Sequence, residues 1–350
     1  MRPVTAVRAL VASALLAVAV VAEAVTPFSI VAGPPRSADV AMATDLARVV
    51  APDADVRLTV DTVPGAVAGL TALGLASGSD LKLGIVTADA YRAMQERADR
   101  GDADAARVMR PMRVVAPLGR REVYFIVRAD SPLQYIDQIR SARINVGPRG
   151  SAGAVTVGEI YRRLFDEPLP AATTSTLTNE DALVRLVTDH GVDVVAFVDG
   201  QPSTLLADMK PESRRFVRLL SFELTHPASA RLLQAYGRTA IRAAAHPNVL
   251  ERDVPTLSVE AWLVANDVEL RRTPGEATRF AQALCRDLPE LQSSGHPKWS
   301  DVRLALPDLG PETFYEELTE RELRACADAA ASAPASAGCT PQQRALGFCR

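Results

Sequence analysis

Residues 144–165 read INVGPRGSAGAVTVGEIYRRLF and join a short β-like run to an amphipathic helix through a glycine-rich loop. Ile144 and Val146 alternate as in a strand, and apolar residues recur from Val157 onward at the spacing of one helix face. Proteins build anion sites from a strand, a glycine loop and a helix N-terminus in this order. The stretch predicts an α/β unit and leaves open a nucleotide loop in an enzyme, a pocket for a carboxylate, or only a well-capped helix.

Strand and helix alternate in the same way over most of the chain. From about residue 25 the order is βαβαβ, which predicts a parallel sheet with right-handed crossovers. Ligands of open α/β sheets bind beyond the carboxyl ends of the strands. Closure of two lobes over one cleft would bring these strand ends together. The ends are expected at residues 33–37, 62–65, 87–89, 147–153 and 199–201.

Two lobes are expected because the α/β pattern stops and restarts. Strands predicted at 112–118 and 122–127 separate the two series, and a helix is expected to begin at Ser131 with Pro132 in its first turn. After about residue 235 the chain is expected to return to the first lobe. The predicted division is a signal peptide at 1–24, lobe one at 25–127 and 235–330, an inserted lobe two at 128–234, and a small-residue linker with a Cys-bounded tail at 331–350.

The N-terminus predicts export. Arg2 and Arg8 precede an apolar run over residues 9–22, and Ala22-Glu23-Ala24 has the small residues of a cleavage site. The run is shorter than the ~20 apolar residues that cross a bilayer, and an uncleaved anchor is the alternative. The mature protein is therefore expected to be periplasmic or secreted. A net charge of -3 without a basic block argues against nucleic acid as a partner.

Four cysteines lie in the last quarter of the chain: Cys285, Cys326, Cys339 and Cys349. An oxidising compartment favours disulfides, and four cysteines allow three pairings. The favoured pairing is Cys285 with Cys326, tying two helices, and Cys339 with Cys349, closing the tail. Metal binding is the weaker alternative because no C-x-x-C occurs and the histidines lack ligand spacing.

Motifs of nucleotide binding and catalysis are absent from the sequence. No Gly-Lys-Ser/Thr occurs, and the glycines of 147–153 are spaced as G-x-x-G-x-x-G rather than as a dinucleotide fingerprint. Neither G-x-S-x-G nor H-E-x-x-H occurs. The sequence therefore predicts binding rather than catalysis, with no catalytic residue, no cofactor and no metal site.

Four positions offer polar contacts to a small ligand. Ser151 can cap the following helix, and the free N–H groups of the next two residues favour a negative group. Arg36 lies in a strand-to-helix loop, where its guanidinium could hold a carboxylate or simply face solvent. Asp89 and Asp199 follow buried strands and could receive an ammonium or a hydroxyl, although both are also ordinary N-cap residues.

The order of these motifs resembles the TAXI family of solute-binding proteins, the extracytoplasmic subunits of TRAP transporters. The resemblance covers about residues 28 to 300. It is carried by an ordered series of segments: FSIVAG, VDTVPGAVAGLTAL, LKLGIVTADAY, VYFIVRADSPLQYIDQIRSARINVGPRGSAGAVTVGEIY, DVVAFVDGQPSTLL and HPNVLERDVPTLSVEAWLVANDV.

The resemblance implies a two-lobed type II periplasmic-binding-protein fold of the α/β class, with parallel-type sheets and a cleft between the lobes. It implies capture of a small anionic solute, such as glutamate or another carboxylate, and delivery to membrane permease subunits. Carried over by position, together with the strand-end argument, the ligand-binding residues are Arg36, Ser37, Gly65, Ala66, Thr87, Asp89, Gly150, Ser151, Ala152, Gly153, Asp199 and Gln201.

Three of these loops depart from the family pattern. The first loop, 33–40, lacks the family's aromatic residue, and 64–66 reads PGA where the family has GGS. Residues 150–153 read GSAG where the family has GSGT. Either the solute differs, with Arg36 supplying a new carboxylate contact, or ligand binding has degenerated.

Three functions are therefore compared. The first is a solute-binding protein that feeds a TRAP-type transporter. The alternative is a binding-protein fold used as a sensor or partner-docking module without a transport role, which the altered loops favour. An exported enzyme ranks last, because no nucleophile, base or metal set is visible. Fold resemblance alone does not fix a function.

Overall fold

The computed structural model describes residues 25–310 and 313–332 of the 350-residue chain. The predicted signal peptide at 1–24 and the predicted Cys339–Cys349 pair lie outside the described residues. Helix α12 (Glu317–Ser332) extends into the range 331–350, which was predicted to be a linker and tail. The rest of that range lies outside the described residues. Within the described ranges, no helix is both long enough and apolar enough to cross a bilayer.

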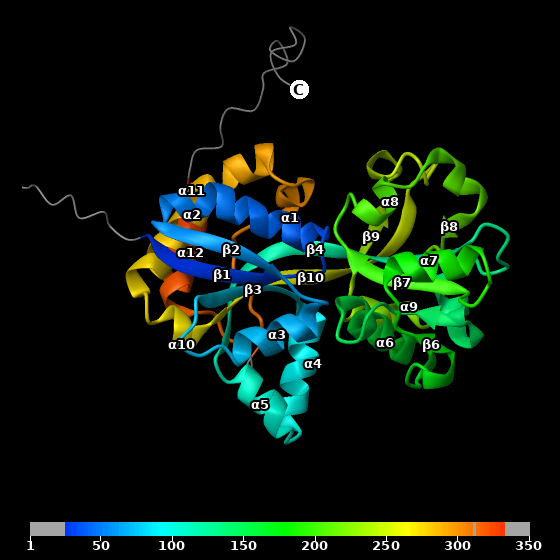
Figure 1. Ribbon diagram of the computed structural model, residues 1–350, viewed down its shortest axis with the longest axis horizontal. Coiled ribbons are helices and arrows are strands. Elements are labelled where there is room, and N and C mark those ends of the chain that lie inside the picture. The colour runs from blue at the N-terminus through cyan, green and yellow to red at the C-terminus, as the bar shows by residue number, and fades with distance from the viewer. Residues whose placement is uncertain (1–24, 311–312, 333–350) are drawn as a thin grey trace, which may run out of the picture.

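Lobe one is built on three parallel strands (Figure 1). β1 (Thr26–Ala32) lies between β2 (Val56–Thr62) and β3 (Leu81–Thr87), so the predicted βαβαβ series is confirmed. β3 is buried over nearly its whole length because packed elements cover both faces of the sheet. The helical segments between these strands and after them are α1 (Ala38–Asp45), a π-helical turn (Leu46–Val50), α2 (Ala51–Asp53), α3 (Ala66–Gly74), α4 (Ala88–Asp99) and α5 (Ala103–Met109).

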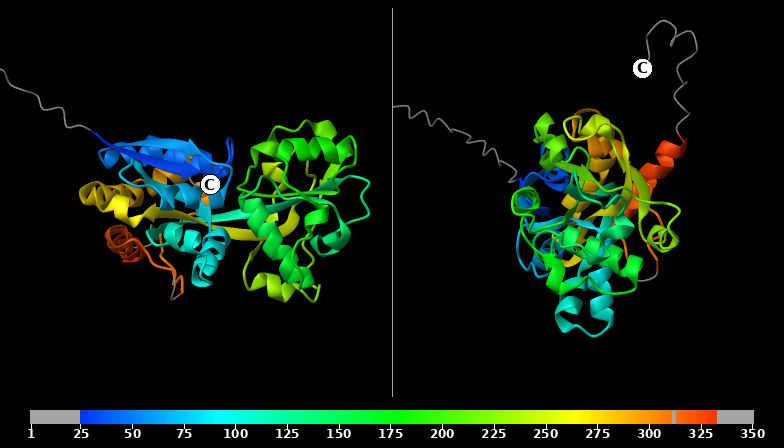
Figure 2. Two further views of the ribbon diagram at one scale, coloured as in Figure 1. Left: turned by 60° about the horizontal axis from the view of Figure 1, so that its bottom comes forward. Right: turned by 90° about the vertical axis from the view of Figure 1, so that its right-hand side faces the viewer.

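Two long antiparallel strands run from lobe one into lobe two, as Figure 2 shows. β10 (Val254–Asn266) lies between β3 and β4 (Met112–Arg128), and β4 continues the sheet into lobe two. Within the described residues, these two strands carry the β-sheet from lobe one into lobe two. Bending of the two lobes toward each other must therefore be taken up along β4 and β10.

The prediction of two separate strands at 112–118 and 122–127 is wrong, because β4 is continuous. The polar run between them is typical of a turn, yet the side chains of Arg121 and Glu122 are buried. Arg121 Nε donates to Asp39 Oδ1 (2.7 Å), and Glu122 Oε1 accepts from Lys298 Nζ (3.0 Å). Partners that are distant in the sequence thus allow charged residues inside a strand.

Lobe two contains a smaller parallel arrangement. β7 (Val194–Asp199) pairs with β4 and with β5 (Ile144–Asn145), and β5 pairs with β6 (Thr174–Ser175). The sheet order is β2-β1-β3-β10-β4-β7-β5-β6, with β8 (Val217–Leu219) on β4 and β9 (Gly237–Ile241) on β10. The helical segments are Ile136–Ser141, α6 (Ala152–Phe165), Ala171–Thr173, α7 (Asn179–Val187), α8 (Thr204–Ala207), Pro211–Arg215, α9 (Ser229–Leu233) and Ala243–Ala245.

The helix expected at Ser131-Pro132 is also wrong. The segment stays non-helical until a short 3-10 turn at Ile136–Ser141. Arg218 on β8 explains this, since its guanidinium donates to the carbonyl oxygens of Ala129 and Ser131 (3.4 and 2.7 Å). These hydrogen bonds hold the segment against β8 in a non-helical form.

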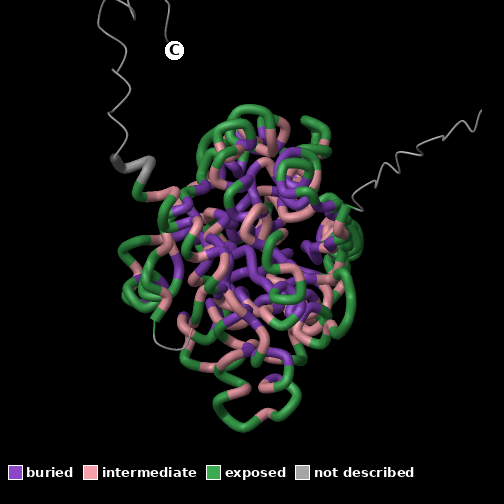
Figure 3. Tube along the Cα trace, turned by 90° about the vertical axis from the view of Figure 1, so that its left-hand side faces the viewer, coloured by how far each residue is buried: buried purple, intermediate pink, exposed green. Residues whose placement is uncertain are grey.

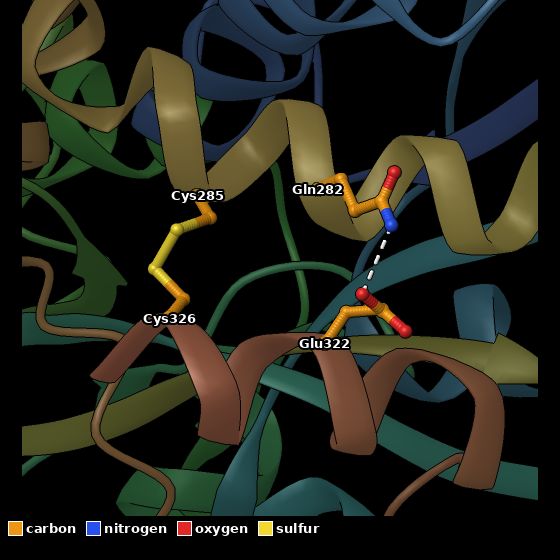
Figure 4. The surroundings of a disulfide bond; sticks show 4 residues. All are labelled: Gln282, Cys285, Glu322 and Cys326. Atoms are coloured by element: carbon orange, nitrogen blue, oxygen red, sulfur yellow. Dashed lines mark hydrogen bonds between the residues drawn. A yellow bond between two sulfur atoms is a disulfide. The ribbon is translucent and has the colours of Figure 1, made fainter. Parts of the chain in front are cut away.

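The C-terminal part packs on lobe one through α10 (Asp267–Leu270), α11 (Pro274–Ser294), a short turn (Pro297–Asp301) and α12. Cys285 on α11 and Cys326 on α12 form a disulfide, which confirms that predicted pair (Figure 4). One turn away, Gln282 Nε2 donates to Glu322 Oε2 (3.0 Å). The two helices are therefore held by a covalent and a polar contact as well as by packing.

Buried residues run through the middle of the molecule and exposed ones form its outer shell (Figure 3). Two hydrophobic clusters lie on the two faces of the lobe-one sheet, and two further clusters do the same in lobe two. Each lobe thus has its own core. The fold is a mixed α/β arrangement in which the strand ends of both lobes face each other across the gap between the lobes.

Candidate functional site

A cavity of about 570 Å³ lies between the two lobes at the carboxyl ends of their parallel strands. Loops that follow β1, β2 and β3 form its lobe-one side, and loops that follow β5 and β7 form much of its lobe-two side. This is where the strand-end argument expects a ligand. The lining residues that the sequence predicted are Arg36, Ser37, Gly65, Ala66, Thr87, Ser151, Ala152, Gly153 and Asp199.

Three predicted residues do not line the cavity. Asp89 accepts hydrogen bonds from Thr156 Oγ1 (2.6 Å) and Tyr236 OH (3.2 Å), so it joins the start of α4 in lobe one to α6. Burial raises the pKa of Asp89, and the Thr156 hydroxyl opposes this shift. Gln201 is buried and bonds to Ala240 O (3.0 Å), which orders the chain behind the cavity.

Gly150, the third, contacts lobe one through its backbone. Its carbonyl oxygen accepts a hydrogen bond from Val67 N (3.1 Å) at the start of α3. A helix N-terminus leaves N–H groups free for an acceptor. Here lobe two supplies that acceptor itself, so one donor that could serve a ligand is used to join the lobes.

Arg36 also links the lobes. It has φ of 68°, and its guanidinium pairs with Asp208 just after α8. Thr204 Oγ1 donates to Arg36 O (2.7 Å) from the same helix. The ion pair is largely exposed, with side-chain exposures of 67% and 59%, so we assign it little stability. The predicted carboxylate clamp is thus occupied by a carboxylate of the protein.

Asp199 places its carboxylate at the N-terminus of α1. Its Oδ1 accepts from Ala38 N (2.9 Å) and from Gly200 N (2.8 Å). Burial raises the pKa of Asp199 to about 6, against the lowering effect of the Ala38 hydrogen bond, and the nearby Asp39 raises it further. The positive end of a lobe-one helix therefore faces an anion that belongs to lobe two.

Ser151 caps α6 as predicted, since its Oγ accepts from Ala154 N (3.1 Å). The same hydroxyl donates to Val146 O (3.2 Å). Both hydrogen-bonding roles of the hydroxyl therefore serve the loop. Any contact of this loop with an anion would come from the backbone N–H groups that begin α6.

Several lining residues were missed by the sequence analysis. Asn179, Glu180, Phe197, Thr204 and Asp208 all face the cavity from lobe two. Oδ1 of Asn179 is buried and makes no hydrogen bond within the described structure. One sequence signal was available, because Thr178 already provides the cap of α7 and leaves the next residue free for another role.

Gly65 lies where the backbones of the two lobes are in close contact. A Cβ at this position would collide with Ser151 Cα and lie 3.0 Å from Ala152 N. These are backbone atoms of lobe two, which can move away only if the lobes separate. Gly69, one turn later on the same helix, has room, because its Cβ would meet Val63 Cγ2 at 3.5 Å.

Gly65→Ala is therefore expected to open the lobes. Overpacking of this kind costs about 1–3 kcal/mol, which shifts the closed-to-open ratio by about 5- to 150-fold. Small-angle X-ray scattering should show a larger radius of gyration for Gly65→Ala than for the wild type. Gly69→Ala is the matched control and should scatter as the wild type does; equal curves for all three proteins would contradict the expectation.

Within the described residues, no group of His, Cys, Asp and Glu side chains is arranged to hold a metal ion. The chemistry that the cavity offers is hydrogen bonding, charge and apolar contact.

Comparison with known proteins gives the following similarities. The solved structures that resemble this one include the arginine-, lysine-, histidine-binding protein ArtJ of Geobacillus stearothermophilus, with 12% identity, TM-score 0.45 and coverage of 81% of this chain and 97% of that one. The aliphatic sulphonate binding protein SsuA of Escherichia coli has 14% identity, TM-score 0.41 and coverage of 86% and 78%. No curated protein matches the chain in sequence. The model of the NMT1-like family matches residues 37–270, which is more than half of the sequence, and the chain therefore belongs to the NMT1-like family.

Proposed function

We propose that this chain is an extracytoplasmic solute-binding protein that captures a small solute and delivers it to the membrane subunits of a TRAP-type transporter. The observation that carries the proposal is the interlobe cavity, which loops of both lobes line. Its volume of about 570 Å³ lies in the range of small-molecule sites. Membership of the NMT1-like family supports a binding role. The protein would act by binding and release rather than by catalysis.

The architecture supports capture by closure. β4 and β10 pass through both lobes, and the other cross-lobe contacts include hydrogen bonds, an ion pair and the packing of Ala152 and Val155 on the lobe-one core, all of which can break. Opening would admit a solute to the strand-end loops, and closing would exclude water around it. Periplasmic location follows from the predicted signal peptide, and the permease partner follows from the sequence resemblance.

The sequence resemblance favours an anionic or amino-acid-like solute. The backbone N–H groups at the start of α6 support a carboxylate at that end of the cavity. Side-chain charge offers less support for a carboxylate. Among the described residues that line the cavity, Arg36 is the only Lys or Arg, and it pairs with Asp208. A test of the function therefore needs anionic, neutral and cationic solutes.

Thermal unfolding of residues 25–350 with a panel of amino acids, dicarboxylates, sulfonates, amides and amines tests the function. A solute present at about 100 times its Kd stabilises the folded state by about 2.7 kcal/mol, so the Tm must rise. The Gly65→Ala variant is the control and should show a smaller rise with the same solute. A panel in which no class raises the Tm would contradict the proposal.

A further inference from the structure

The charges that line the cavity are unbalanced. Asp39, Glu180, Asp199 and Asp208 face it together with a single arginine, Arg36. Asp39 forms an ion pair with Arg121, whose side chain is 1% exposed and is not part of the cavity wall. Asp208 forms an ion pair with Arg36. Within the described residues, Asp199 and Glu180 have no cationic partner. The cavity therefore presents net negative charge to whatever enters it.

The place where an anion would be most stable in lobe one is already filled. The N-terminus of α1 donates the Ala38 N–H to Asp199 Oδ1 at 2.9 Å. The Val67 N–H of α3 goes to Gly150 O at 3.1 Å. Both acceptors come from lobe two, so closure uses these helix ends without a solute. A carboxylate solute would bring a second negative charge close to Asp199, and the repulsion between the two charges would weaken its binding.

The rest of the wall favours an apolar body that carries donors. Ile85, Val146, Phe197 and Leu205 line the cavity from both lobes. Asn179 Oδ1 is a buried acceptor without a hydrogen bond in the described structure. Buried acceptors without a donor are unfavourable, so a solute N–H close to Asn179 would gain from meeting one.

We propose that the cavity takes a solute without a carboxylate: a neutral or cationic molecule with an apolar body and an N–H donor group, an amide or an amine, directed at Asp199. This inference rests on the proposed function, because it names the class of solute for the same cavity. It replaces the anionic class that the sequence resemblance implies. The discriminating residue is Asp199, which belongs to lobe two and closes against α1.

The test uses sets of compounds that share a body and differ in the head group. Phenethylamine, phenylacetamide and phenylacetate form one set, and butylamine, butyramide and butyrate form another. Binding to residues 25–350 is measured by calorimetry at about pH 8, where Asp199, with a pKa of about 6, is ionised. The amine or the amide of a set is expected to bind at least about tenfold more tightly than its carboxylate.

Two variants separate the role of Asp199 from general charge. Asp199→Asn keeps an oxygen for the Ala38 and Gly200 N–H groups, so the closed form stays possible. It is expected to reduce the preference for amine over carboxylate at least about fivefold. Glu212→Gln removes the same charge from an exposed position of lobe two that does not line the cavity, and it should keep the wild-type preference.

The outcomes distinguish the two proposals. Tighter binding of carboxylates, or a preference that Asp199→Asn leaves unchanged, overturns this inference and leaves the solute-binding function in place. Binding that is confined to amines and amides and depends on Asp199 supports both. The absence of binding in every set contradicts the inference, while the broader panel of solutes decides the function separately.

Discussion

Replacing Lys298 by Met is expected to lower the free energy of unfolding by about 3–5 kcal/mol, because it leaves the Glu122 carboxylate buried without its cation. Lys298 is 2% exposed and Glu122 is 3% exposed, and Nζ lies 3.0 Å from Oε1. Lys298 comes from the turn after α11, whereas Glu122 is in the middle of β4. The pair therefore ties the C-terminal part of lobe one to the strand that leads into lobe two.

Urea denaturation followed by circular dichroism measures this change. The double variant Lys298→Met with Glu122→Gln removes both charges and should recover most of the lost stability. Asp301→Asn is the matched control, because Asp301 also contacts Lys298 Nζ (2.7 Å) but its side chain is 45% exposed, so a loss below about 1 kcal/mol is expected. A single Lys298→Met variant within about 1 kcal/mol of the wild type would show that the pair is not important for stability.

Loss of the Cys285–Cys326 disulfide is expected to have an effect of similar size. The bond closes a loop with a sequence separation of 41, for which the chain-entropy model gives about 4 kcal/mol. α12 carries Leu323 into the lobe-one core, so it is the element that the bond holds in place. The double variant Cys285→Ala with Cys326→Ala should lower the Tm by about 6 °C.

Differential scanning calorimetry under non-reducing conditions measures this decrease. Gln282→Ala is the control, since it removes the hydrogen bond between the same two helices at Glu322 and should cost about 1 kcal/mol or less. A Tm that changes by less than about 2 °C in the double variant would mean that packing alone positions α12.

Local patterns in the sequence were sufficient for much of the fold. The helix predicted after the loop at 147–153 is α6, and the strands predicted before Gly33 and Thr62 are β1 and β2. These elements have an apolar period or a cap that lies within a few residues. β4 was divided wrongly because its buried charges depend on Asp39 and Lys298, which no local window contains.

The candidate site divides in the same way. Parallel strands end at one edge of a sheet, so the loops that line the cavity could be found from the order of the elements alone. The contacts of individual side chains could not be predicted in this way. Arg36, Asp89 and Asp199 each bond across the gap to the opposite lobe, and such partners depend on how the lobes close.

The position of β10 has a consequence for folding. It lies between β3 and β4 in the sheet, although it begins at Val254 and β4 ends at Arg128. Until β10 has been synthesised, β3 and β4 each present an unpaired edge, and unpaired edges promote association with other chains. Pairing between segments so far apart is slow. Lobe one can therefore complete its sheet only after all of lobe two has been made.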